Sequence, residues 1–250
     1  MKLSIITITF NAADTIEDAV QSVLSQRQDG FELEYLVIDG ASKDATLEIL
    51  APYRDRLTLI SEPDKGIYDA MNKGISLASG DYVGILNADD LYAADDVLMR
   101  VAALFKSSGA KSIYGDLVYV DRDDPTEVTR TWNSGAFNRQ AFLHGWMPPH
   151  PTFFVRKSVY DTHGLFSLEL RSAADYELML RFLFKTGITT AYLPSILVRM
   201  RVGGLSNASL GNRWRANRED RQAWRMNGIP PYPWTLFLKP VRKVSQLWKL

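Results

Sequence analysis

Carboxylates follow several of the short apolar runs in this sequence of 250 residues. Asp39 ends the run 33–39, and Asp64 comes shortly after the run 57–61. Asp89 and Asp90 are adjacent and follow the run 82–86. Carboxylate and phosphate oxygens are hard ligands that suit Mg²⁺ or Mn²⁺. The pattern therefore indicates cation-assisted chemistry on a phosphate-bearing ligand.

The runs alternate with segments of helical spacing, which predicts the elements that position these carboxylates. We expect strands at 3–10, 33–39, 57–61 and 82–86, separated by helices at 16–24, 46–50 and 67–78. Such alternation predicts a parallel sheet with right-handed crossovers. The predicted fold class is therefore α/β, with a mainly parallel central sheet flanked by helices. Further along, we expect helices at 97–105 and 174–184 and strands at 112–121, 127–132 and 188–198.

Polar residues at four strand ends should converge, because ligands bind beyond the carboxyl ends of the strands in open α/β sheets. A lone Asp at a strand end is more often a helix cap, but four coincident polar ends favour a binding site. Neither a G-x-G-x-x-G nor a P-loop pattern occurs, so a bound diphosphate would need a cation to neutralise it. The residues at these ends are Thr9 and Asn11, Asp39, Asp64, and Asp89 with Asp90.

The composition is that of a soluble globular protein, with 46% apolar and 23% charged residues. The chain has no cysteine, which excludes disulfides and thiolate metal sites. Residues 3–10 predict a first strand rather than a signal peptide, since polar residues interrupt the run. No run approaches the roughly 20 apolar residues of a membrane-spanning helix.

The net charge of zero conceals a basic C-terminal end. Residues 201–250 contain 10 Lys or Arg and 2 Asp or Glu, out of 29 of each kind in the chain, so they carry +8 and the rest carries −8. We expect a body at 1–205 and a basic, amphipathic helical extension at 206–250. Aromatic and basic side chains interleaved at 234–250 are typical of an interfacial membrane segment. The alternatives are a helix packed on the body, a dimer interface or a solvated helix face. We do not expect nucleic-acid binding, because the arginines come without a recognised fold for it.

Five motifs in order resemble the inverting family-2 glycosyltransferases with the GT-A fold, especially the bacterial surface-polysaccharide branch. The resemblance covers roughly residues 1–200. Asn87 stands where many relatives have an acidic residue, and Ala45 where they often have Gly. The motifs are Thr7-Ile8-Thr9-Phe10-Asn11, the stretch IDGASKDAT at 38–46, the stretch SEPDKGIYDAMNKG at 61–74, Asn87-Ala88-Asp89-Asp90, and Ala174-Asp175-Tyr176-Glu177.

The resemblance implies a nucleotide-sugar donor and a divalent cation, Mn²⁺ or Mg²⁺. Asp39 would accept from the base, Asp89 would contact the ribose or donor sugar, and Asp90 would bind the metal. His150, in the Pro-rich loop 145–151, would complete the metal site or touch the acceptor, although a lone His is more often structural. The residues that would bind the donor are Thr9, Asn11, Asp39, Ser42, Asp64, Lys65, Asn72 and Asp89.

Asp175 is the residue that the resemblance makes the general base. Inverting transfer is one displacement, in which the acceptor hydroxyl must lose a proton to a positioned carboxylate. The leaving nucleoside diphosphate departs on the opposite side, with its charge held by the cation. From position alone, Asp175 could equally be a cap of the helix that it begins.

The expected acceptor is a glycan or a lipid-linked sugar, which would place a cytoplasmic enzyme at the inner face of the cell membrane. A sugar-phosphate nucleotidyltransferase is one alternative. That enzyme would require a Gly-rich basic loop after the first strand, and residues 11–14 do not form one. The other rival is a catalytically silent protein that binds nucleotide sugars or glycans. The intact Asp90 and Asp175 argue against it.

Overall fold

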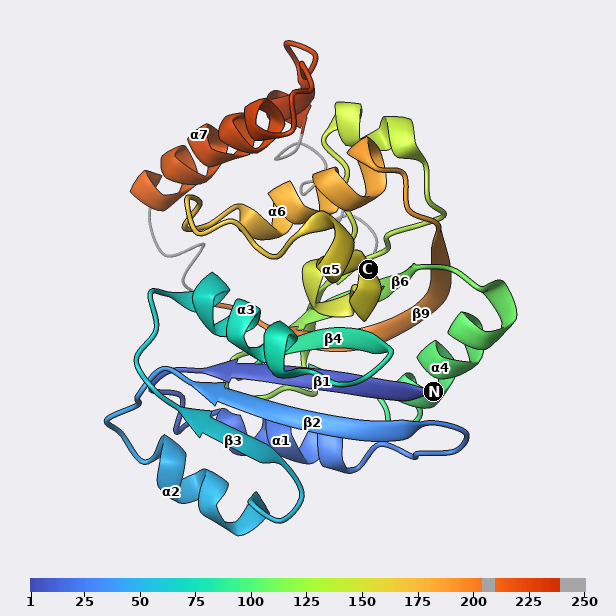
Figure 1. Cartoon of the computed structure of the whole chain (residues 1–250). Coiled ribbons are helices and arrows are strands. Elements are labelled where there is room, and N and C mark those ends of the chain that lie inside the picture. The colour runs from blue at the N-terminus through green and yellow to red at the C-terminus, as the bar shows by residue number, and fades with distance from the viewer. Residues whose placement is uncertain (204–209, 239–250) are drawn as a thin grey trace.

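The computed structural model describes residues 1–203 and 210–238. Its first third alternates strands and helices as expected from the sequence. Figure 1 shows α3 on one face of this part of the sheet and α1 with α2 on the other. The elements are β1 (Lys2–Thr9), α1 (Ile16–Leu24), β2 (Glu32–Asp39), α2 (Thr46–Leu50), the 3₁₀ turn Ala51–Tyr53, β3 (Thr58–Ser61), α3 (Ile67–Leu77) and β4 (Tyr82–Asn87).

The predicted α/β class is confirmed, with a parallel half and a mixed half in one sheet. In the described part of the chain the strand order is β3-β2-β1-β4-β8-β6-β9-β5, and β7 pairs with β6. β3, β2, β1 and β4 are parallel to one another, whereas β8 is antiparallel to both of its neighbours. The later strands are β5 (Asp90–Tyr92), β6 (Ser112–Val120), β7 (Val128–Trp132), β8 (Phe154–Arg156) and β9 (Thr190–Arg201).

Two strands that are consecutive in the chain lie at distant places in the sheet. β5 begins at Asp90, just after β4 ends at Asn87, yet it pairs with β9 at the edge. The turn that carries Asp89 therefore leads from the parallel half to the mixed half.

Alternate residues of β1 contribute to two cores, one on each face of the sheet, as the twofold repeat of a strand requires. Ile5 packs in the core that contains Val20 of α1, whereas Ile6 packs in the core that contains Met71 of α3. α3 lies very close to β1, because a Cβ at Gly74 would stand 2.4 Å from Cγ2 of Ile6. This close packing fixes the start of α3 relative to the strand ends.

Short helices cover the mixed half of the sheet. The predicted helix at 174–184 is present as α6, which continues into a π-helical turn. None of the helices in the described ranges is long and apolar enough to cross a membrane. The elements are α4 (Val97–Ser108), two 3₁₀ segments (Arg139–His144 and His150–Thr152), α5 (Lys157–His163), α6 (Ala174–Met179), the π-helical turn Leu180–Lys185 and α7 (Leu210–Met226).

The basic C-terminal segment contributes to the core of the body. Trp224 of α7 is fully buried, and its indole N–H donates to the Tyr176 hydroxyl at 3.0 Å. Further along, the Thr235 hydroxyl donates to the carbonyl of Leu143 at 2.6 Å. Packing on the body, one of the alternatives for this segment, therefore describes α7. Of the amphipathic stretch 234–250, residues from 239 on lie outside the described ranges.

Candidate active site

The carboxyl ends of the parallel strands meet at one edge of the sheet. The register sets Thr9 beside Asp39 and Asp39 beside Ser61, while Ile8 on the other side of β1 pairs with Asn87. The polar residues that the sequence places at these ends therefore share one rim. Thr9 is buried there, and its hydroxyl has no hydrogen-bond partner within the described protein.

Asp39 forms the buried floor of this rim. Its Oδ2 accepts from the Ser42 backbone N–H at 3.0 Å and from the Ser61 hydroxyl at 2.6 Å, and its Oδ1 accepts from the Ser42 hydroxyl. The Ser42 hydroxyl also accepts from the backbone N–H of Asn11 at 2.8 Å. Asn11 has a positive φ of 49°, a conformation that Asn tolerates better than most residues. Ser42 thus joins the ends of β1 and β2.

Phe10 stands exposed above this floor, with 62% of its surface accessible. A Cβ at Gly40 would lie 2.6 Å from Oδ2 of Asp64 and 3.3 Å from Cδ2 of Phe10, so the absence of a side chain there lets both groups approach. The other oxygen of Asp64 accepts from the Gly66 N–H at 2.7 Å. An exposed ring beside a buried carboxylate can stack on a planar base. The sequence signal for it, an aromatic residue directly after a buried strand, received no role in the sequence interpretation.

The two adjacent carboxylates differ in exposure. Asp90 is fully buried, and its Oδ2 accepts from the Asn87 side-chain amide at 2.9 Å. Burial raises the pKa of Asp90 well above its usual range, and the charge of Asp89 raises it further. Asp89 is only partly buried. Burial raises its pKa too, while Arg201 and Arg122 oppose that shift. Asp89 is therefore the more accessible of the two side chains.

A metal cage made by protein alone is absent from the described residues, in which no three His, Asp or Glu side chains form a cluster. His150 accordingly does not join Asp89 and Asp90 in a three-ligand group. Its ring lies edge-on to Phe166, with centroids 5.6 Å apart. Burial lowers the pKa of His150, and the charge of nearby Asp175 opposes this shift. Oδ1 of Asp90 is buried without a hydrogen-bond partner in the described protein, and such an oxygen fits a cation whose other ligands come from phosphate and water.

Asp175 lies in the first turn of α6 and is held from α3. Its Oδ1 accepts from the Tyr68 hydroxyl at 3.1 Å. Burial, and then the charge of Asp175, raise the pKa of Tyr68, so this hydroxyl stays a donor. The residue at the cap of α6 is Ala173, which makes no side-chain cap bond. Asp175 therefore does not serve as the helix cap that its position would also allow.

Asn72 supports this arrangement rather than facing the strand ends. Its side-chain amide donates to the Phe166 carbonyl at 2.9 Å and accepts from the Phe166 N–H at 2.9 Å. The Phe166 ring stacks on Tyr68, with centroids 5.5 Å apart. Both functional groups of Asn72 are thus engaged with backbone. The prediction that Asn72 completes the nucleotide and phosphate site with Asp64 and Lys65 stays a prediction.

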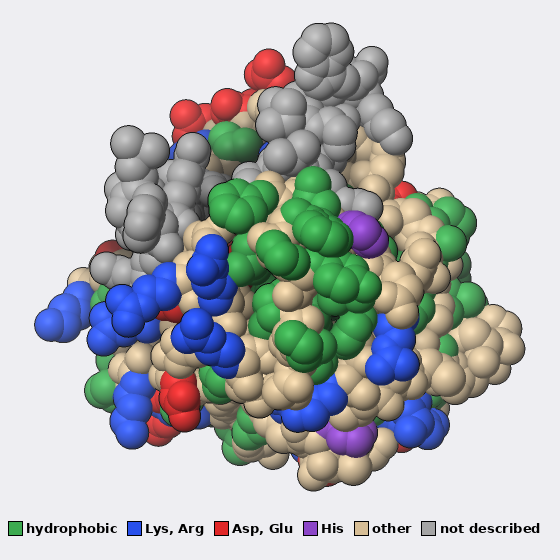
Figure 2. Space-filling view, turned by 90° about the horizontal axis from the view of Figure 1, so that it is seen from above, with side chains coloured by type: hydrophobic (Ala, Val, Ile, Leu, Met, Phe, Trp, Pro, Cys, Tyr) green, Lys and Arg blue, Asp and Glu red, His purple; other side chains and the backbone are tan. Residues whose placement is uncertain are grey.

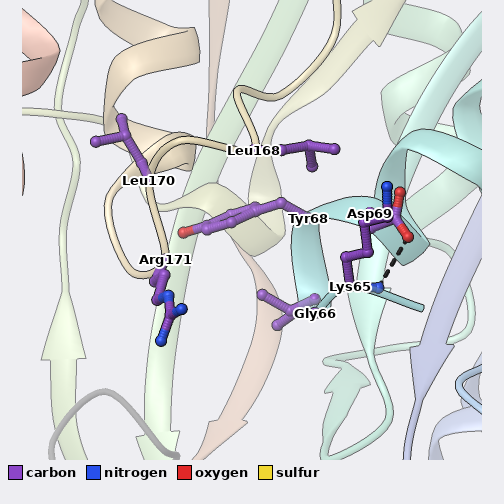
Figure 3. A pocket seen from close by; sticks show the side chains of 8 residues that line it. Lys65, Gly66, Tyr68, Asp69, Leu168, Leu170 and Arg171 are labelled. Atoms are coloured by element: carbon purple, nitrogen blue, oxygen red, sulfur yellow. Dashed lines mark hydrogen bonds between the residues drawn. The ribbon is translucent and has the colours of Figure 1, made fainter.

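A cavity of about 450 Å³ opens beside Tyr68 (Figure 3). The first turn of α3 forms one side, and the loop that leads to α6 forms the other. In Figure 3 the Tyr68 ring lies between these sides, and Arg171 comes from the loop. The sequence interpretation named Lys65 from this set and missed the others. The lining residues are Lys65, Gly66, Ile67, Tyr68, Asp69, Leu168, Leu170 and Arg171.

A carboxylate of α7 fixes the loop on the far side of this cavity. Oε2 of the buried Glu219 accepts from the backbone N–H groups of Arg171 and Ser172, at 3.1 and 2.7 Å, and from the Ser172 hydroxyl at 2.9 Å. The basic C-terminal segment therefore shapes the approach to Asp175.

A parallel sheet with aspartates at its carboxyl edge, followed by a mixed half that carries a further carboxylate, is the architecture of the GT-A fold. The model of glycosyl transferase family 2 matches residues 4–169. The chain belongs to this family, as the resemblance in its motifs indicated.

Relatives in mycobacteria support this assignment. A PGL/p-HBAD biosynthesis glycosyltransferase of Mycobacterium bovis (strain BCG / Pasteur 1173P2) is 32% identical over 210 residues, which are 82% of this chain and 78% of that protein. An uncharacterized glycosyltransferase of Mycobacterium tuberculosis (strain CDC 1551 / Oshkosh) is 34% identical over 181 residues, or 72% of this chain and 68% of that one.

Solved structures share the fold at low sequence identity. TarS 1-349 of S. aureus, in complex with UDP-GlcNAc, aligns with a TM-score of 0.70 at 18% identity, over 91% of this chain and 65% of that one. The mannosyltransferase PcManGT of Pyrobaculum calidifontis, in complex with GDP-Man and Mn²⁺, aligns with a TM-score of 0.66 at 20% identity, over 98% of this chain and 71% of that one.

Proposed function

We propose that this protein transfers a sugar from a nucleoside-diphosphate sugar to a hydroxyl of a glycan or lipid-linked acceptor, with inversion at the anomeric carbon. The observation that carries the proposal is the pairing of two carboxylate environments. Asp39 lies in a buried polar floor at the strand ends, and Asp175 is oriented by the Tyr68 hydroxyl at 3.1 Å from another part of the chain. The environment of Asp39 suits recognition of the nucleotide, and that of Asp175 suits proton transfer.

The donor lies along the rim of the parallel half. Asp39 accepts a hydrogen bond from the base, and Phe10 stacks on its face. Thr9, Asn11, Ser42 and Asp64 complete the pocket around the nucleoside, and Thr9 offers the unpartnered hydroxyl noted above. The nucleotide sugars bound by TarS and PcManGT support this class of donor.

Asp90 is the residue that we assign to the cation, because its Oδ1 is buried without a hydrogen-bond partner in the described part of the chain. A bound Mn²⁺ or Mg²⁺ would supply charge neutralisation to the leaving diphosphate. The Mn²⁺ of PcManGT supports the choice of a divalent ion. Asp89, which is partly exposed beside it, would contact the ribose or the donor sugar.

Asp175 takes the proton of the attacking acceptor hydroxyl as the new glycosidic bond forms. The bond between the anomeric carbon and the diphosphate oxygen breaks in the same displacement, and the nucleoside diphosphate leaves with that electron pair. Tyr68 holds Oδ1 of Asp175, so that Oδ2 is directed to the acceptor. A positioned base of this kind contributes roughly 10²–10⁴-fold to the rate.

The face that carries α7 is where we place contact with the inner surface of an anionic membrane. Tyr232, Trp234 and Phe237 are large apolar side chains with 44%, 50% and 66% of their surfaces exposed. Seen from above, hydrophobic side chains gather on this face with Lys and Arg around them (Figure 2). Exposed aromatics beside basic residues suit a membrane interface.

Release of nucleoside diphosphate tests the main proposal. The protein is incubated with Mn²⁺ and a panel of nucleotide sugars, with and without glycan and lipid-linked acceptors. We expect release with one class of donor, stimulated by acceptor, and a product of inverted configuration by NMR. Binding of a donor without any release or transfer would instead favour the silent binding protein.

A further inference from the structure

Arg201 is a buried arginine at the end of β9, the strand that pairs with β5. Only 4% of its surface is exposed. A buried guanidinium costs free energy unless its N–H groups find acceptors, so its bonds show what holds it there. The sugar transfer proposed above does not use this residue.

The guanidinium bonds to three separate segments of the chain. Its Nε donates to the Arg122 carbonyl at 3.0 Å, in the turn 121–127 between β6 and β7. Its Nη1 donates to the Asp89 carbonyl at 3.2 Å, in the turn between β4 and β5. Its Nη2 donates to Oδ2 of Asp18, in the first turn of α1. One side chain thus joins segments that lie 79, 112 and 183 residues away from it.

The bond to Asp89 lies directly beside the carboxylate that we assign to the cation. Asp90 pairs with Met200 in the register of β5 and β9, so the strand that ends in Arg201 also holds the backbone of Asp90. The Asn87 amide engages Oδ2 of Asp90 at 2.9 Å, and Oδ1 is left without a partner in the described part of the chain. The direction of that oxygen therefore depends on the backbone of this turn.

α1 provides a fixed support for the same turn. Its Ser22 hydroxyl accepts from the Tyr92 backbone N–H at 3.2 Å, at the far end of β5. Asp18 lies one turn earlier in α1 and holds Arg201. The strand β5 and the turn before it are therefore both held from this helix.

The charge of Arg201 does not by itself account for a role in holding a cation. A positive charge close to Asp89 and Asp90 opposes the binding of a second positive charge. The planar guanidinium, in contrast, directs its donors in fixed directions and can hold three segments in one geometry. A lysine carries the same charge on a single ammonium group at the end of a flexible stem, so it does not reproduce this geometry.

We propose that Arg201 is a positioning residue for the cation. It fixes the turn that carries Asp89 and Asp90, and so directs Oδ1 of Asp90 to the metal. The inference rests on the proposed function, in which Asp90 holds Mn²⁺ or Mg²⁺. Groups that orient a metal ligand change metal affinity or activity by roughly 10–100-fold when they are removed.

Calorimetric titrations of UDP, once with Mn²⁺ and once with EDTA, measure the contribution of the cation without any turnover. Arg201→Lys keeps the charge but loses the three-point geometry, so we expect the gain in UDP affinity from Mn²⁺ to fall about tenfold. The affinity for UDP in EDTA should stay unchanged, because Asp39 and its partners are not altered. An unchanged affinity in EDTA also shows that the variant is folded.

Arg199→Lys is the matched control. Arg199 lies two residues earlier on β9 and also donates to the turn 121–127, at the Pro125 carbonyl at 3.2 Å, whereas the bond to Asp89 comes from Arg201. Both UDP affinities should be native in this variant. Asp18→Asn is a milder change at a half-exposed side chain, and it should reduce the gain from Mn²⁺ a few-fold. This variant carries the test if Arg201→Lys does not fold.

Four outcomes would overturn the inference. Arg201→Lys could keep the full gain from Mn²⁺, which would show that the geometry of the guanidinium is not needed. Asp18→Asn could keep the full gain, which would show that the support from α1 is not needed. Arg199→Lys could lose as much as Arg201→Lys, which would make both residues anchors of the turn 121–127 only. Arg201→Lys could lose UDP affinity equally in EDTA, which would mean that it disturbs the nucleotide site as a whole.

Asp90→Asn separates a failure of this inference from a failure of the proposed function. If Asp90→Asn loses the gain from Mn²⁺ while Arg201→Lys keeps it, the cation site stands and only the role of Arg201 is wrong. If Asp90→Asn keeps the gain, the cation is not held by Asp90, and the proposed function fails at that step together with the inference.

Discussion

On the proposed donor side, Asp39 accepts hydrogen bonds from Ser42 and Ser61, at separations of 3 and 22 residues. On the proposed acceptor side, Asp175 accepts one from Tyr68, 107 residues away. The loop before Asp175 is in turn held by Glu219, at a separation of 48 and 47 residues from its partners. The donor side is built from neighbouring strand ends, and the acceptor side from distant segments. Donor recognition and acceptor recognition should therefore be separable by mutation.

The largest expected effect separates binding from chemistry at Asp175. Asp175→Asn keeps the shape and the bond from Tyr68 but removes the base, so transfer should fall roughly 10²–10⁴-fold. UDP binding in the presence of Mn²⁺, measured by calorimetry, should stay unchanged. Asp39→Asn is the counterpart, and it should weaken UDP. Normal turnover in Asp175→Asn would refute the assignment of the base.

The adjacent carboxylates give the next effect. Asp90→Asn should lower kcat/KM about 100-fold and raise the Mn²⁺ concentration for half-activation, because it removes the carboxylate that would hold the cation. Asp89→Asn is the comparison at the adjacent carboxylate, and it should raise the KM of the donor without changing the Mn²⁺ requirement. The reverse order of effects would assign the cation to Asp89, the more accessible of the two side chains.

Substitution of Glu219 tests whether α7 affects acceptor binding without affecting donor binding. Glu219→Ala leaves two backbone N–H groups and one hydroxyl without their acceptor, so the acceptor KM should rise about tenfold. The affinity for UDP should not change. Glu169→Ala, at an exposed glutamate of the same loop, is the control. An equal loss of UDP affinity would show that the two sides are not independent.

The exposed aromatics should give a smaller, several-fold effect on membrane association. Removing Trp234 and Phe237 together, as a double Ala variant, should lower the fraction that floats with anionic liposomes, because less apolar surface is inserted. Leu77→Ala removes an equally exposed apolar residue from α3 and should have no effect. Unchanged flotation of the double variant would count against this face as the membrane contact.

The smallest effect concerns the donor half and its stability at low pH. Burial raises the pKa of Glu34, but hydrogen bonds from Ser4 and Ser79 and the contact with Lys2 outweigh it and lower the pKa to about 2. A carboxyl whose pKa is lowered on folding stabilises the fold at pH values above its unfolded pKa of 4.5. This stabilisation is lost as the pH falls from 4.5 towards the folded pKa of about 2. The Tm difference between the native protein and Glu34→Gln should shrink over that window. The exposed Glu48→Gln should give no such trend, and a constant difference for Glu34→Gln would argue against the shift.

The sequence predicts the parts of this protein that are built from neighbouring segments better than the parts that are built from distant ones. Apolar runs and helical spacing predicted β1 to β4 and their helices, and hence the shared rim, because those signals are local. The three-residue β5 was missed, since a strand that short has no periodicity of its own. The docking of α7 through Trp224 was left open, because its partner Tyr176 lies 48 residues away.

Individual side chains at the site show the same limit. Asn72 was predicted to contact the nucleotide, and the structure shows its amide bonded to the backbone of Phe166, 94 residues away. The metal was predicted at Asp90, and only the fold reveals that this carboxylate is buried while Asp89 is partly open. Both assignments stay predictions. Tyr68 was passed over because it lies beside the apolar stripe of α3, and its bond to Asp175 cannot be inferred from spacing.

The bond from Glu219 to the loop before Asp175 has a consequence for the order in which the protein folds. Because Glu219 comes 47 residues after Ser172, the loop gains this clamp only once α7 has docked on the body. Refolding should therefore restore nucleotide binding before it restores sugar transfer.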